Sequence, residues 1–369
     1  MRILIAGGGS GGHVHPGLAV ATALRQQETR VELHWLGSKG GIEEGLVAAA
    51  GIPFTPIHAG KLNRFASLQT LRDLARVPVG LLDAVAAVSR LRPDAALTCG
   101  GFVAAPAGAA MWLTGRPLLA LQQDIEPNLA NRLISPFAQK VGVAFAASIG
   151  FFPPGKAIVT GNPVRPDLFE ATAAQGRRMF GLPETFPVVL VTGGSQGALS
   201  LNRLVLARLG RWLERASVIH LCGARSVAMV ETAAAALPES LRSRYAWRSF
   251  VTYEMGAALA AADVVVCRAG AATLAELAAL GKAAILVPLP PPVGRSPQEA
   301  NAQALANAGA AIALPERTAS PDLLLAHVCA LLDDPMQRQY LASRLAALGH
   351  PSAAEDIARL LMRLACLPT

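Results

Sequence analysis

The sequence predicts an α/β protein built from two doubly wound parallel sheets, and two observations lead to this fold class. Short apolar runs bounded by glycine alternate along the chain with stretches rich in alanine and leucine, a pattern typical of βαβ units. The pattern then starts again at Pro187, where an apolar run leads into a second glycine-rich turn. With 369 residues the chain is long enough for about two domains.

The first half of the chain opens on an apolar run that enters a turn of glycines, as a strand does at the start of a βαβ unit. The strands expected in this half are Arg2–Ala6, Val31–Leu36, Phe54–Ile57, Ala95–Cys99, Leu118–Gln122 and Lys140–Ala144. The helices expected between them are Gly17–Gln27, Glu43–Ala50, Leu68–Arg90 and Ala104–Leu113.

The second half repeats this organisation after the proline-containing linker 161–166. Its expected strands are Pro187–Thr192, Val218–Leu221, Asp263–Cys267 and Ala283–Pro288, with helices at Ser200–Arg215 and Ala353–Ala365. We expect a first domain of residues 1–162, joined by the C-terminal helix at about 350–369, and a second domain of residues 163–349. Two such sheets would face a cleft with the carboxyl ends of their strands, where ligands bind in these folds.

Composition excludes several classes of protein. A hydrophobic content of 52% with 16% charged residues excludes a disordered or coiled-coil chain. Five scattered cysteines without C-x-x-C spacing suit neither a disulfide framework nor a zinc site, so we expect a reducing cytoplasm. We expect no secretory leader and no membrane-spanning helix. The net charge of +8 fits nucleic acid or an anionic membrane, and charge alone leaves both partners open.

The turn Gly7–His13 is the first feature that carries chemistry. Its glycines let backbone N–H groups approach a ligand, and the helix that follows favours a phosphate or a developing anion. It is not a P-loop, because it lacks the lysine of that motif. His13 is a candidate general base, since an imidazole accepts a proton near neutral pH, although it could instead cap the helix or line the cleft. We interpret His15 as structural.

The turn Gly193–Gly197, with Ser195 and Gln196 in it, stands at the corresponding point of the second half. Two glycine turns favour transfer of a group out of a phosphate-bearing donor. An NAD enzyme would normally carry an acidic residue about 20 residues beyond the first turn, and Leu36-Gly37-Ser38 offers none. Hydride transfer is therefore the weaker alternative.

The segment Arg268–Glu276 is a strand end followed by a turn of small residues and a helix. Its N–H groups and the Thr273 hydroxyl are candidates for holding a pyrophosphate, and Glu276 for accepting both hydroxyls of a ribose. The structural alternative is that Thr273 caps a helix and forms a capping box with Glu276.

Four motifs in this order together resemble the MurG family, which moves N-acetylglucosamine (GlcNAc) from UDP-GlcNAc onto undecaprenyl-pyrophosphoryl-N-acetylmuramoyl-pentapeptide. They lie at residues 7–21, 161–165, 193–202 and 262–276. The resemblance implies a GT-B fold, with the acceptor on the N-terminal domain and UDP-GlcNAc on the C-terminal one. It also implies an inverting transfer to the C4 hydroxyl of N-acetylmuramic acid, the conversion of lipid I to lipid II in peptidoglycan synthesis. We expect no cofactor and, without an Asp-x-Asp motif, no metal.

The resemblance assigns site residues position by position. His13 matches the family's candidate base, Arg165 and Ser195 match groups near the nucleotide, and the backbone of Val251 matches the group that reads uracil. Where the family usually reads His-Glu-Gln-Asn, this chain has Leu121-Gln122-Gln123-Asp124; in the family this segment touches the sugar or acceptor. The expected UDP-GlcNAc contacts are Ser10, Gly11, Gly12, Asp124, Arg165, Ser195, Val251, Ala271, Ala272, Thr273, Leu274, Ala275, Glu276, Gln298 and Asn301.

The stretch Lys61–Arg92 carries six basic residues against two acidic ones, with leucines among them. Such a mixture can rest on an anionic membrane surface, or it can be a helix packed on the sheet with a solvated rim. A lipid-linked acceptor favours the membrane, so we expect a peripheral protein on the cytoplasmic face of the inner membrane that binds no nucleic acid. Two alternatives stay open: a related transferase acting on another lipid or small acceptor, and a nucleotide-sugar epimerase or NAD enzyme.

Overall fold

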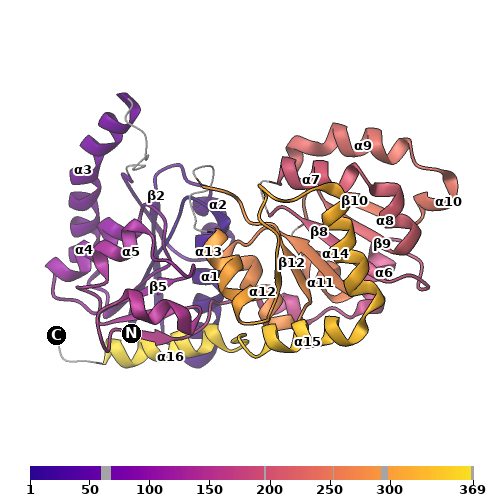
Figure 1. Cartoon of the computed structure of the whole chain (residues 1–369). Coiled ribbons are helices and arrows are strands. Elements are labelled where there is room, and N and C mark those ends of the chain that lie inside the picture. The colour runs from indigo at the N-terminus through magenta and orange to yellow at the C-terminus, as the bar shows by residue number, and fades with distance from the viewer. Residues whose placement is uncertain (60–67, 195–196, 252, 292–297, 367–369) are drawn as a thin grey trace. The chain divides into compact units, whose positions relative to one another are not determined.

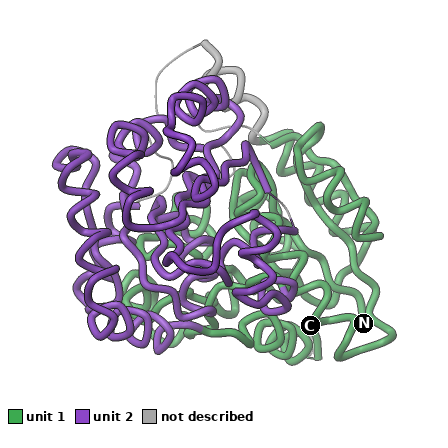
Figure 2. Tube along the Cα trace, turned by 90° about the vertical axis from the view of Figure 1, so that its right-hand side faces the viewer, with its two compact units in different colours: residues 1–165, 350–369 green, residues 166–349 purple. Residues whose placement is uncertain are grey.

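A computed structural model of the chain describes residues 1–59, 68–194, 197–251, 253–291 and 298–366. The chain forms two compact units: unit 1 is Met1–Arg165 with His350–Thr369, and unit 2 is Pro166–Gly349 (Figure 2). Each unit contains one parallel sheet with helices packed against it (Figure 1). The predicted class of two doubly wound parallel sheets is confirmed. The chain passes between units at 165 and 166, against the expected 162 and 163.

The sheet of unit 1 has the strand order β3-β2-β1-β4-β5-β6-β7, and its neighbouring strands pair in parallel. Its strands are β1 (Arg2–Ala6), β2 (Glu32–Ser38), β3 (Phe54–Ile57), β4 (Ala95–Thr98), β5 (Leu118–Gln122), β6 (Lys140–Val143) and β7 (Ala157–Val159). Its helices are α1 (Gly11–Gln27), α2 (Glu43–Ala49), α3 (Leu68–Leu91), α4 (Ala104–Leu113), α5 (Leu129–Ile134), the 3₁₀ helix η1 (Ala146–Phe151) and α16 (Ala353–Ala365).

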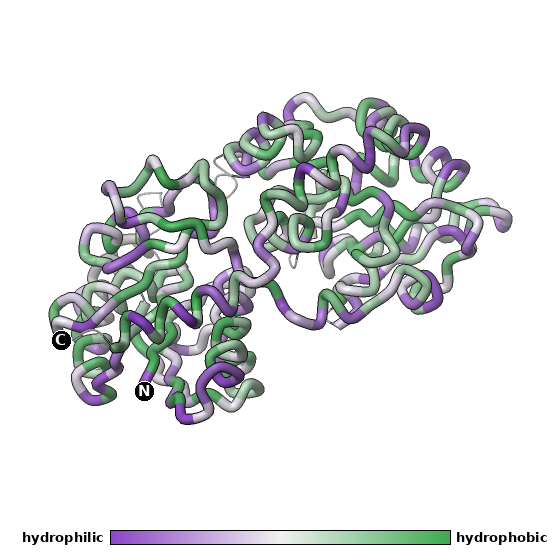
Figure 3. Tube along the Cα trace, turned by 90° about the horizontal axis from the view of Figure 1, so that it is seen from below, coloured by the Kyte–Doolittle hydropathy of each residue, from purple (hydrophilic) through white to green (hydrophobic). Residues whose placement is uncertain are grey.

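Both faces of this sheet are buried, which is why its central strands β1, β4 and β5 are nearly continuous apolar runs rather than alternating ones. Ile3 and Ile5 pack with α1, α2 and α16 on one face, whereas Leu4 and Ala6 pack with α3, α4 and α5 on the other. Hydrophobic and hydrophilic residues alternate along the covering helices (Figure 3), and α16 turns Ile357 and Leu361 towards α1 and the sheet. The last helix of the chain therefore completes the core of unit 1.

The sheet of unit 2 has the order β10-β9-β8-β11-β12-β13, again with parallel pairing. Its strands are β8 (Val188–Thr192), β9 (Ser217–Leu221), β10 (Tyr245–Arg248), β11 (Val264–Cys267), β12 (Ala284–Leu286) and β13 (Ile312–Ala313). Its helices are η2 (Pro166–Phe169), α6 (Ala173–Met179), α7 (Leu199–Leu206), α8 (Leu209–Arg215), η3 (Ala224–Ser226), α9 (Val227–Ala235), α10 (Glu239–Arg242), α11 (Met255–Ala261), α12 (Ala271–Leu280), α13 (Gln298–Asn307), α14 (Pro321–Asp333) and α15 (Pro335–Ala346).

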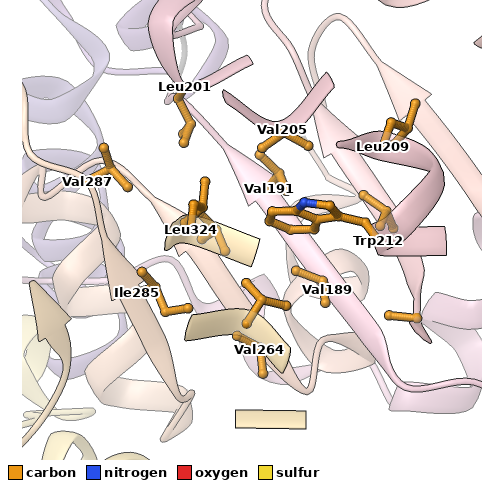
Figure 4. Packing of buried hydrophobic residues seen from close by; sticks show 14 of the residues in the cluster. Val189, Val191, Leu201, Val205, Leu209, Trp212, Val264, Ile285, Val287 and Leu324 are labelled. Carbon is orange, nitrogen blue, oxygen red and sulfur yellow. The ribbon is translucent and has the colours of Figure 1, made fainter. Parts of the chain in front are cut away.

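One large core joins this sheet to α7, α8 and α14. Figure 4 shows the indole of Trp212 among Val189, Val191 and Val205, and Trp212 is 1% exposed. On the opposite face α11 contacts β8, α6 and α12. The two-sided burial explains why the central strands β8 and β11 of this unit, too, are nearly continuous apolar runs.

The strand orders locate the point where the winding of each sheet reverses, between β1 and β4 in unit 1 and between β8 and β11 in unit 2. Ligands of open α/β sheets bind outside the carboxyl ends of the strands at this switch point. The glycine turns that follow β1 and β8 are therefore in the positions where a binding site is expected.

Two predicted helices differ from the observed ones. The first begins at Gly11 rather than Gly17, because the glycines of the turn themselves form its first turn. The expected helix Ser200–Arg215 is instead two helices, because Arg208 leaves the helical conformation and its guanidinium binds Asp322 on α14 at 2.6 and 2.9 Å. The short strands β7, β10 and β13 were not predicted, since runs of two to four residues give little periodicity.

Candidate active site

The first glycine turn joins the carboxyl end of β1 to α1, beside the switch point of the unit 1 sheet. Gly9 has a φ of +84°, a conformation that glycine adopts without strain. Ser10 is extended and precedes the helix, so Gly11 and Gly12 are its first residues. The N-terminus of α1, the positive end of its dipole, therefore lies at this edge of the sheet, and its first turn contains no acidic residue.

His13 lies in the first turn of α1, with its side chain half-buried and Nδ1 3.1 Å from the Ser10 hydroxyl. The loop after β4 packs closely on the ring. A Cβ atom at Gly100 would lie 2.8 Å from Cδ2 of the imidazole, and one at Gly101 would lie 2.1 Å from the Gly8 carbonyl oxygen. Both residues have positive φ, so glycine is required there on two counts.

Burial lowers the pKa of His13 below its ordinary value, and this effect outweighs three that raise it: the charge of Asp124, a hydrogen bond to the Gly8 carbonyl and the charge of Glu43. The imidazole is therefore neutral at pH 7 and has a lone pair to accept a proton. This is the state that a general base needs.

Side-chain amides form hydrogen bonds that hold the segment after β5, a role that the sequence analysis did not predict. Gln123 donates from Nε2 to the Cys99 carbonyl at 2.8 Å, and Gln122 donates to the Asp124 carbonyl at 2.7 Å. Asn131 in turn donates to Oε1 of Gln122 at 2.7 Å. These hydrogen bonds fix the loop that carries Asp124. The charge of Asp124 in turn raises the pKa of His13.

The second glycine turn follows β8. Gly197 has a φ of +71°, and a Cβ atom there would lie 2.5 Å from the Cys222 carbonyl oxygen. That carbonyl also accepts a hydrogen bond from the buried amide of Asn202 at 2.7 Å. The expected contact residue Ser195, with Gln196, lies outside the described residues.

The segment of small residues begins α12 and does not form a capping box. Gly270 precedes the helix without a side-chain cap, so Thr273 lies inside the first turn and cannot be the capping residue. Leu274 and Ala275 are buried, so only their backbone atoms remain for a ligand. Burial raises the pKa of Cys267 at the end of β11, and the charge of the half-buried Glu276 adds to this effect.

Arg268 ties the loops around α12 together. Its buried guanidinium donates to the carbonyl oxygens of Val287 at 2.9 Å and Pro288 at 3.2 Å, and to the Ser200 hydroxyl at 2.8 Å. It also forms an ion pair with Glu316. One side chain therefore links the ends of β11 and β12 to the start of α7.

Gln298 and Asn301 lie on the first turns of α13, beside the start of α12. Asn301 is 1% exposed and donates to the Ala269 carbonyl at 3.0 Å. Gln298 accepts a hydrogen bond from the Leu289 N–H at 3.0 Å. Both side chains are thus already bound to the backbone of the strand ends.

The predicted residues gather at the carboxyl edge of each sheet. In unit 1 these are Ser10, Gly11, Gly12, His13 and Asp124; in unit 2 they are Ala271 to Glu276 with Gln298 and Asn301. Val251 is buried in the loop after β10, and Arg165 is half-buried at the end of unit 1, before η2. Sequence reasoning missed Glu43, which is fully buried and accepts a hydrogen bond from the Gly9 N–H.

The described residues contain no group of three or more His, Cys, Asp or Glu side chains arranged to hold a metal ion. Within the same ranges, no helix is both long enough and apolar enough to cross a membrane.

Family models match both halves of the chain. The N-terminal domain of glycosyltransferase family 28 matches residues 3–143, and the C-terminal domain of the same family matches residues 188–357. The matched ranges contain the two glycine turns and the α12 segment.

Relatives match along nearly the whole chain. The UDP-N-acetylglucosamine–N-acetylmuramyl-(pentapeptide) pyrophosphoryl-undecaprenol N-acetylglucosamine transferase of Desulforudis audaxviator is 36% identical, and the match covers 99% of each chain. The transferase of the same name from Chlorobium luteolum is 37% identical, also over 99% of each chain.

Solved structures agree with these matches. MurG of Acinetobacter baumannii superimposes with a TM-score of 0.76 at 28% identity, over 98% of this chain and 99% of that one. A UDP-GlcNAc 2-epimerase of Neisseria meningitidis, bound to UDP-GlcNAc, has a TM-score of 0.68 at 15% identity over 98% and 100% of the two chains, a likeness of fold alone. Since the relatives that are 36% and 37% identical over 99% of each chain are transferases of this name, and both domains of glycosyltransferase family 28 match, this chain belongs to the MurG family of glycosyltransferases.

Proposed function

We propose that the protein transfers GlcNAc from UDP-GlcNAc to the C4 hydroxyl of N-acetylmuramic acid in undecaprenyl-pyrophosphoryl-MurNAc-pentapeptide, which converts lipid I to lipid II. The observation that carries this proposal is the match to transferases of that name over 99% of both chains. The neutral, half-buried imidazole at the switch point of unit 1 supports it, because an inverting transfer to a hydroxyl needs a base.

In the proposed reaction His13 accepts the proton of the acceptor's C4 hydroxyl as the oxygen attacks the anomeric carbon of GlcNAc. The bond from that carbon to the diphosphate oxygen breaks, and UDP leaves with the electron pair. Attack from the face opposite UDP inverts the configuration and forms a β-1,4 link. Helix N-termini stabilise the charge that develops on the diphosphate, and α12 offers one without acidic residues in its first turn.

We assign acceptor binding to unit 1 and UDP-GlcNAc to unit 2, with Ser10, Gly11, Gly12 and Asp124 approaching the donor from unit 1. In unit 2 the N–H groups from Ala271 onward would hold the diphosphate, and Glu276 would accept the ribose hydroxyls. Val251 reads uracil through its backbone, Arg165 and Ser195 contact the nucleotide, and the sugar contacts are Gln298 and Asn301. Asn301 is almost fully buried and also donates to the Ala269 carbonyl, so it would in addition fix the backbone before α12.

The test is UDP release by purified protein from UDP-GlcNAc, with and without a synthetic lipid-pyrophosphoryl-MurNAc-pentapeptide. UDP-glucose and UDP-GalNAc serve as competing donors. We expect release that requires the acceptor and is selective for UDP-GlcNAc. UDP-GlcNAc binding without turnover on this acceptor would instead favour a related transferase with another lipid or small acceptor.

Glu276→Ala is expected to weaken UDP binding about tenfold or more, because hydrogen bonds to a carboxylate contribute about 1.5–3 kcal/mol. Titration calorimetry with UDP measures this effect. Glu231→Ala, a charge removed from an exposed position on α9, is the control and should bind UDP as the parent does. Unchanged affinity in Glu276→Ala would remove Glu276 from the ribose site.

We also propose that unit 1 binds the anionic cytoplasmic face of the inner membrane as a peripheral protein. The helices α3, α4 and α5 neighbour one another on one flank of unit 1 (Figure 1), and each carries exposed apolar side chains. Trp112 and Phe137 stack with ring centroids 4.4 Å apart although both are exposed. We define the apolar patch as Val79, Leu82, Trp112, Leu113, Leu133 and Phe137.

The predicted membrane segment Lys61–Arg92 contributes only part of this patch. The described end of α3 packs on the sheet through Ala84, Ala87 and Val88, while Leu82 is 69% exposed. The helix is therefore both a covering helix and a source of outward apolar side chains. Residues 61–67 of the segment, with the basic residues Lys61 and Arg64, lie outside the described residues.

Replacing both Leu82 and Trp112 by serine is expected to weaken binding to vesicles of anionic phospholipid about tenfold or more, since burying one large apolar side chain contributes about 1.5–3 kcal/mol. Co-sedimentation with the vesicles measures the bound fraction. Met336→Ser, which removes a 75% exposed apolar side chain from α15, is the control. An equal loss of vesicle binding in the double variant and in Met336→Ser would contradict the role of the apolar patch in membrane binding.

A further inference from the structure

A carboxylate is buried next to the first glycine turn. Glu43 is the first residue of α2 and is 0% exposed. Its carboxylate accepts hydrogen bonds from the N–H of Gly9 at 3.2 Å and the N–H of Ser38 at 2.7 Å, and one from the Ser38 hydroxyl. A buried charged group normally requires such partners, and here one of them belongs to the turn that leads to His13.

The chain makes room for this carboxylate with glycines from three places in the sequence. A Cβ atom at Gly8 would lie 2.1 Å from Oε1 of Glu43, and one at Gly41 would lie 2.4 Å from Oε2. A Cβ atom at Gly37 would lie 3.0 Å from Cγ. A side chain at Gly8 or Gly41 would displace the Glu43 carboxylate, whereas a Cβ atom at Gly37 would first meet the Phe54 ring, at 2.4 Å.

The position of Glu43 has two chemical consequences. The Gly9 N–H is already bound, so it is not offered to a phosphate, and the negative charge opposes a second anion at this point of the turn. The same charge also acts on His13. Two carboxylates influence this imidazole, Asp124 from the loop after β5 and Glu43 from α2, and both raise its pKa against the effect of burial.

We propose that Glu43 is a positioning residue of the transfer reaction: it holds the Gly7–Gly12 turn in the shape that supports His13 and keeps a fixed negative charge near the imidazole. The inference rests on the proposed function, because it assigns the base a supporting group. It also explains why the first turn is suited to a hydroxyl acceptor and its base rather than to the pyrophosphate of a dinucleotide.

The test compares Glu43→Gln with Glu44→Gln. Both remove one negative charge from the start of α2, but Glu44 is exposed. In Glu43→Gln we expect kcat to fall about tenfold, since a small displacement of a catalytic group costs at least that much. KM for UDP-GlcNAc should stay within about twofold of the parent's, because most of the proposed donor contacts lie in unit 2 and are not altered. The acid limb of the kcat profile should move to lower pH, since losing the carboxylate lowers the pKa of His13. Parent-like kcat and pH profile in Glu43→Gln would overturn the inference.

A second variant covers the case in which Glu43→Gln does not fold. Gly41→Ala keeps the charge but places a methyl group against the carboxylate, at a residue whose φ is not positive. We expect it to lower kcat in the same way, with KM for UDP-GlcNAc unchanged. Parent-like kcat in a folded Gly41→Ala protein would also overturn the inference.

NMR titration of His13 without substrates separates this inference from the proposed function. We expect the imidazole to titrate at lower pH in Glu43→Gln than in the parent and in Glu44→Gln. If the parent shows no acceptor-dependent UDP release, the proposed transfer fails, while this titration still tests the link between the two side chains. Titration at the same pH in all three proteins would overturn the electrostatic role.

Discussion

His13→Ala is expected to lower kcat by about two to four orders of magnitude, the range that general base catalysis contributes. KM for UDP-GlcNAc should change little, because the imidazole acts on the acceptor's proton in the transition state rather than on the bound donor. Steady-state rates of acceptor-dependent UDP release measure both constants. His34→Ala, another histidine of unit 1 but on β2, should keep parent-like rates.

The pH profile provides an independent check of the same assignment. Since burial lowers the pKa of His13 from its ordinary value of 6.5, the acid limb of kcat/KM in the parent should inflect below pH 6.5. Activity is lost as the pH falls through this inflection, because the protonated imidazole cannot accept a proton. This limb should be missing from the residual activity of His13→Ala. If His13→Ala keeps an acid limb at the parent's pH, a group other than His13 causes that limb.

The second large effect is expected in the stability of unit 2, where a neutral histidine is part of a buried network. His220 on β9 is fully buried, with Nε2 2.9 Å from Oδ1 of Asn202 and Nδ1 2.8 Å from the hydroxyl of Tyr245. Since the amide oxygen can only accept, Nε2 carries the hydrogen and the Tyr245 hydroxyl donates to Nδ1. Burial lowers the pKa of His220 to about 4.

The sign of the effect follows from proton binding in the two states. Between pH 6.5 and about pH 4 the unfolded chain binds a proton at His220 that the folded unit does not. The free energy of unfolding of unit 2 therefore includes its full share from neutral His220 above pH 6.5. That share, in total about 3 kcal/mol, is lost as the pH falls through this window. Acidification should thus weaken unit 2 before the carboxylates of the chain become protonated.

Hydrogen exchange of the β9 amides between pH 7 and pH 5 measures the opening free energy of unit 2 separately from unit 1. We expect this free energy to fall with pH in the parent and to vary much less in His220→Gln, even though that variant is less stable overall. His327→Gln on α14 should keep the parent's slope. A parent-like slope in His220→Gln would show that other groups cause it.

The network also connects stability to the donor side of the proposed reaction. Asn202, which His220 holds, donates to the Cys222 carbonyl, and that carbonyl lies where a Cβ atom at Gly197 would come within 2.5 Å. The second glycine turn therefore packs against the buried network of Asn202, His220 and Tyr245. Its shape depends on residues from α7, β9 and β10, which sequence reasoning did not connect.

Several features of this protein were determined by short stretches of its sequence. The strands β1, β3 and β5 and the helices α4 and α16 have the predicted bounds. Their bounds depend on the spacing of apolar residues and on nearby glycine or proline, which are local features of the sequence. The glycine turns could be read for the same reason, since close backbone approach requires glycine at each point locally. Their order along the chain was enough to indicate the family, which the full-length relatives confirm.

Only the tertiary structure decided where distant residues meet. The break between α7 and α8 accompanies an ion pair from Arg208 to Asp322, 114 positions away, and no local pattern contains that partner. Glu43 looked like an ordinary residue of a helix, and its place is set by Gly8, Gly37 and Gly41 coming together around it. Local sequence determines backbone shape through short-range sterics and periodicity, whereas the burial of a charge depends on which distant segments exclude water and supply its hydrogen bonds.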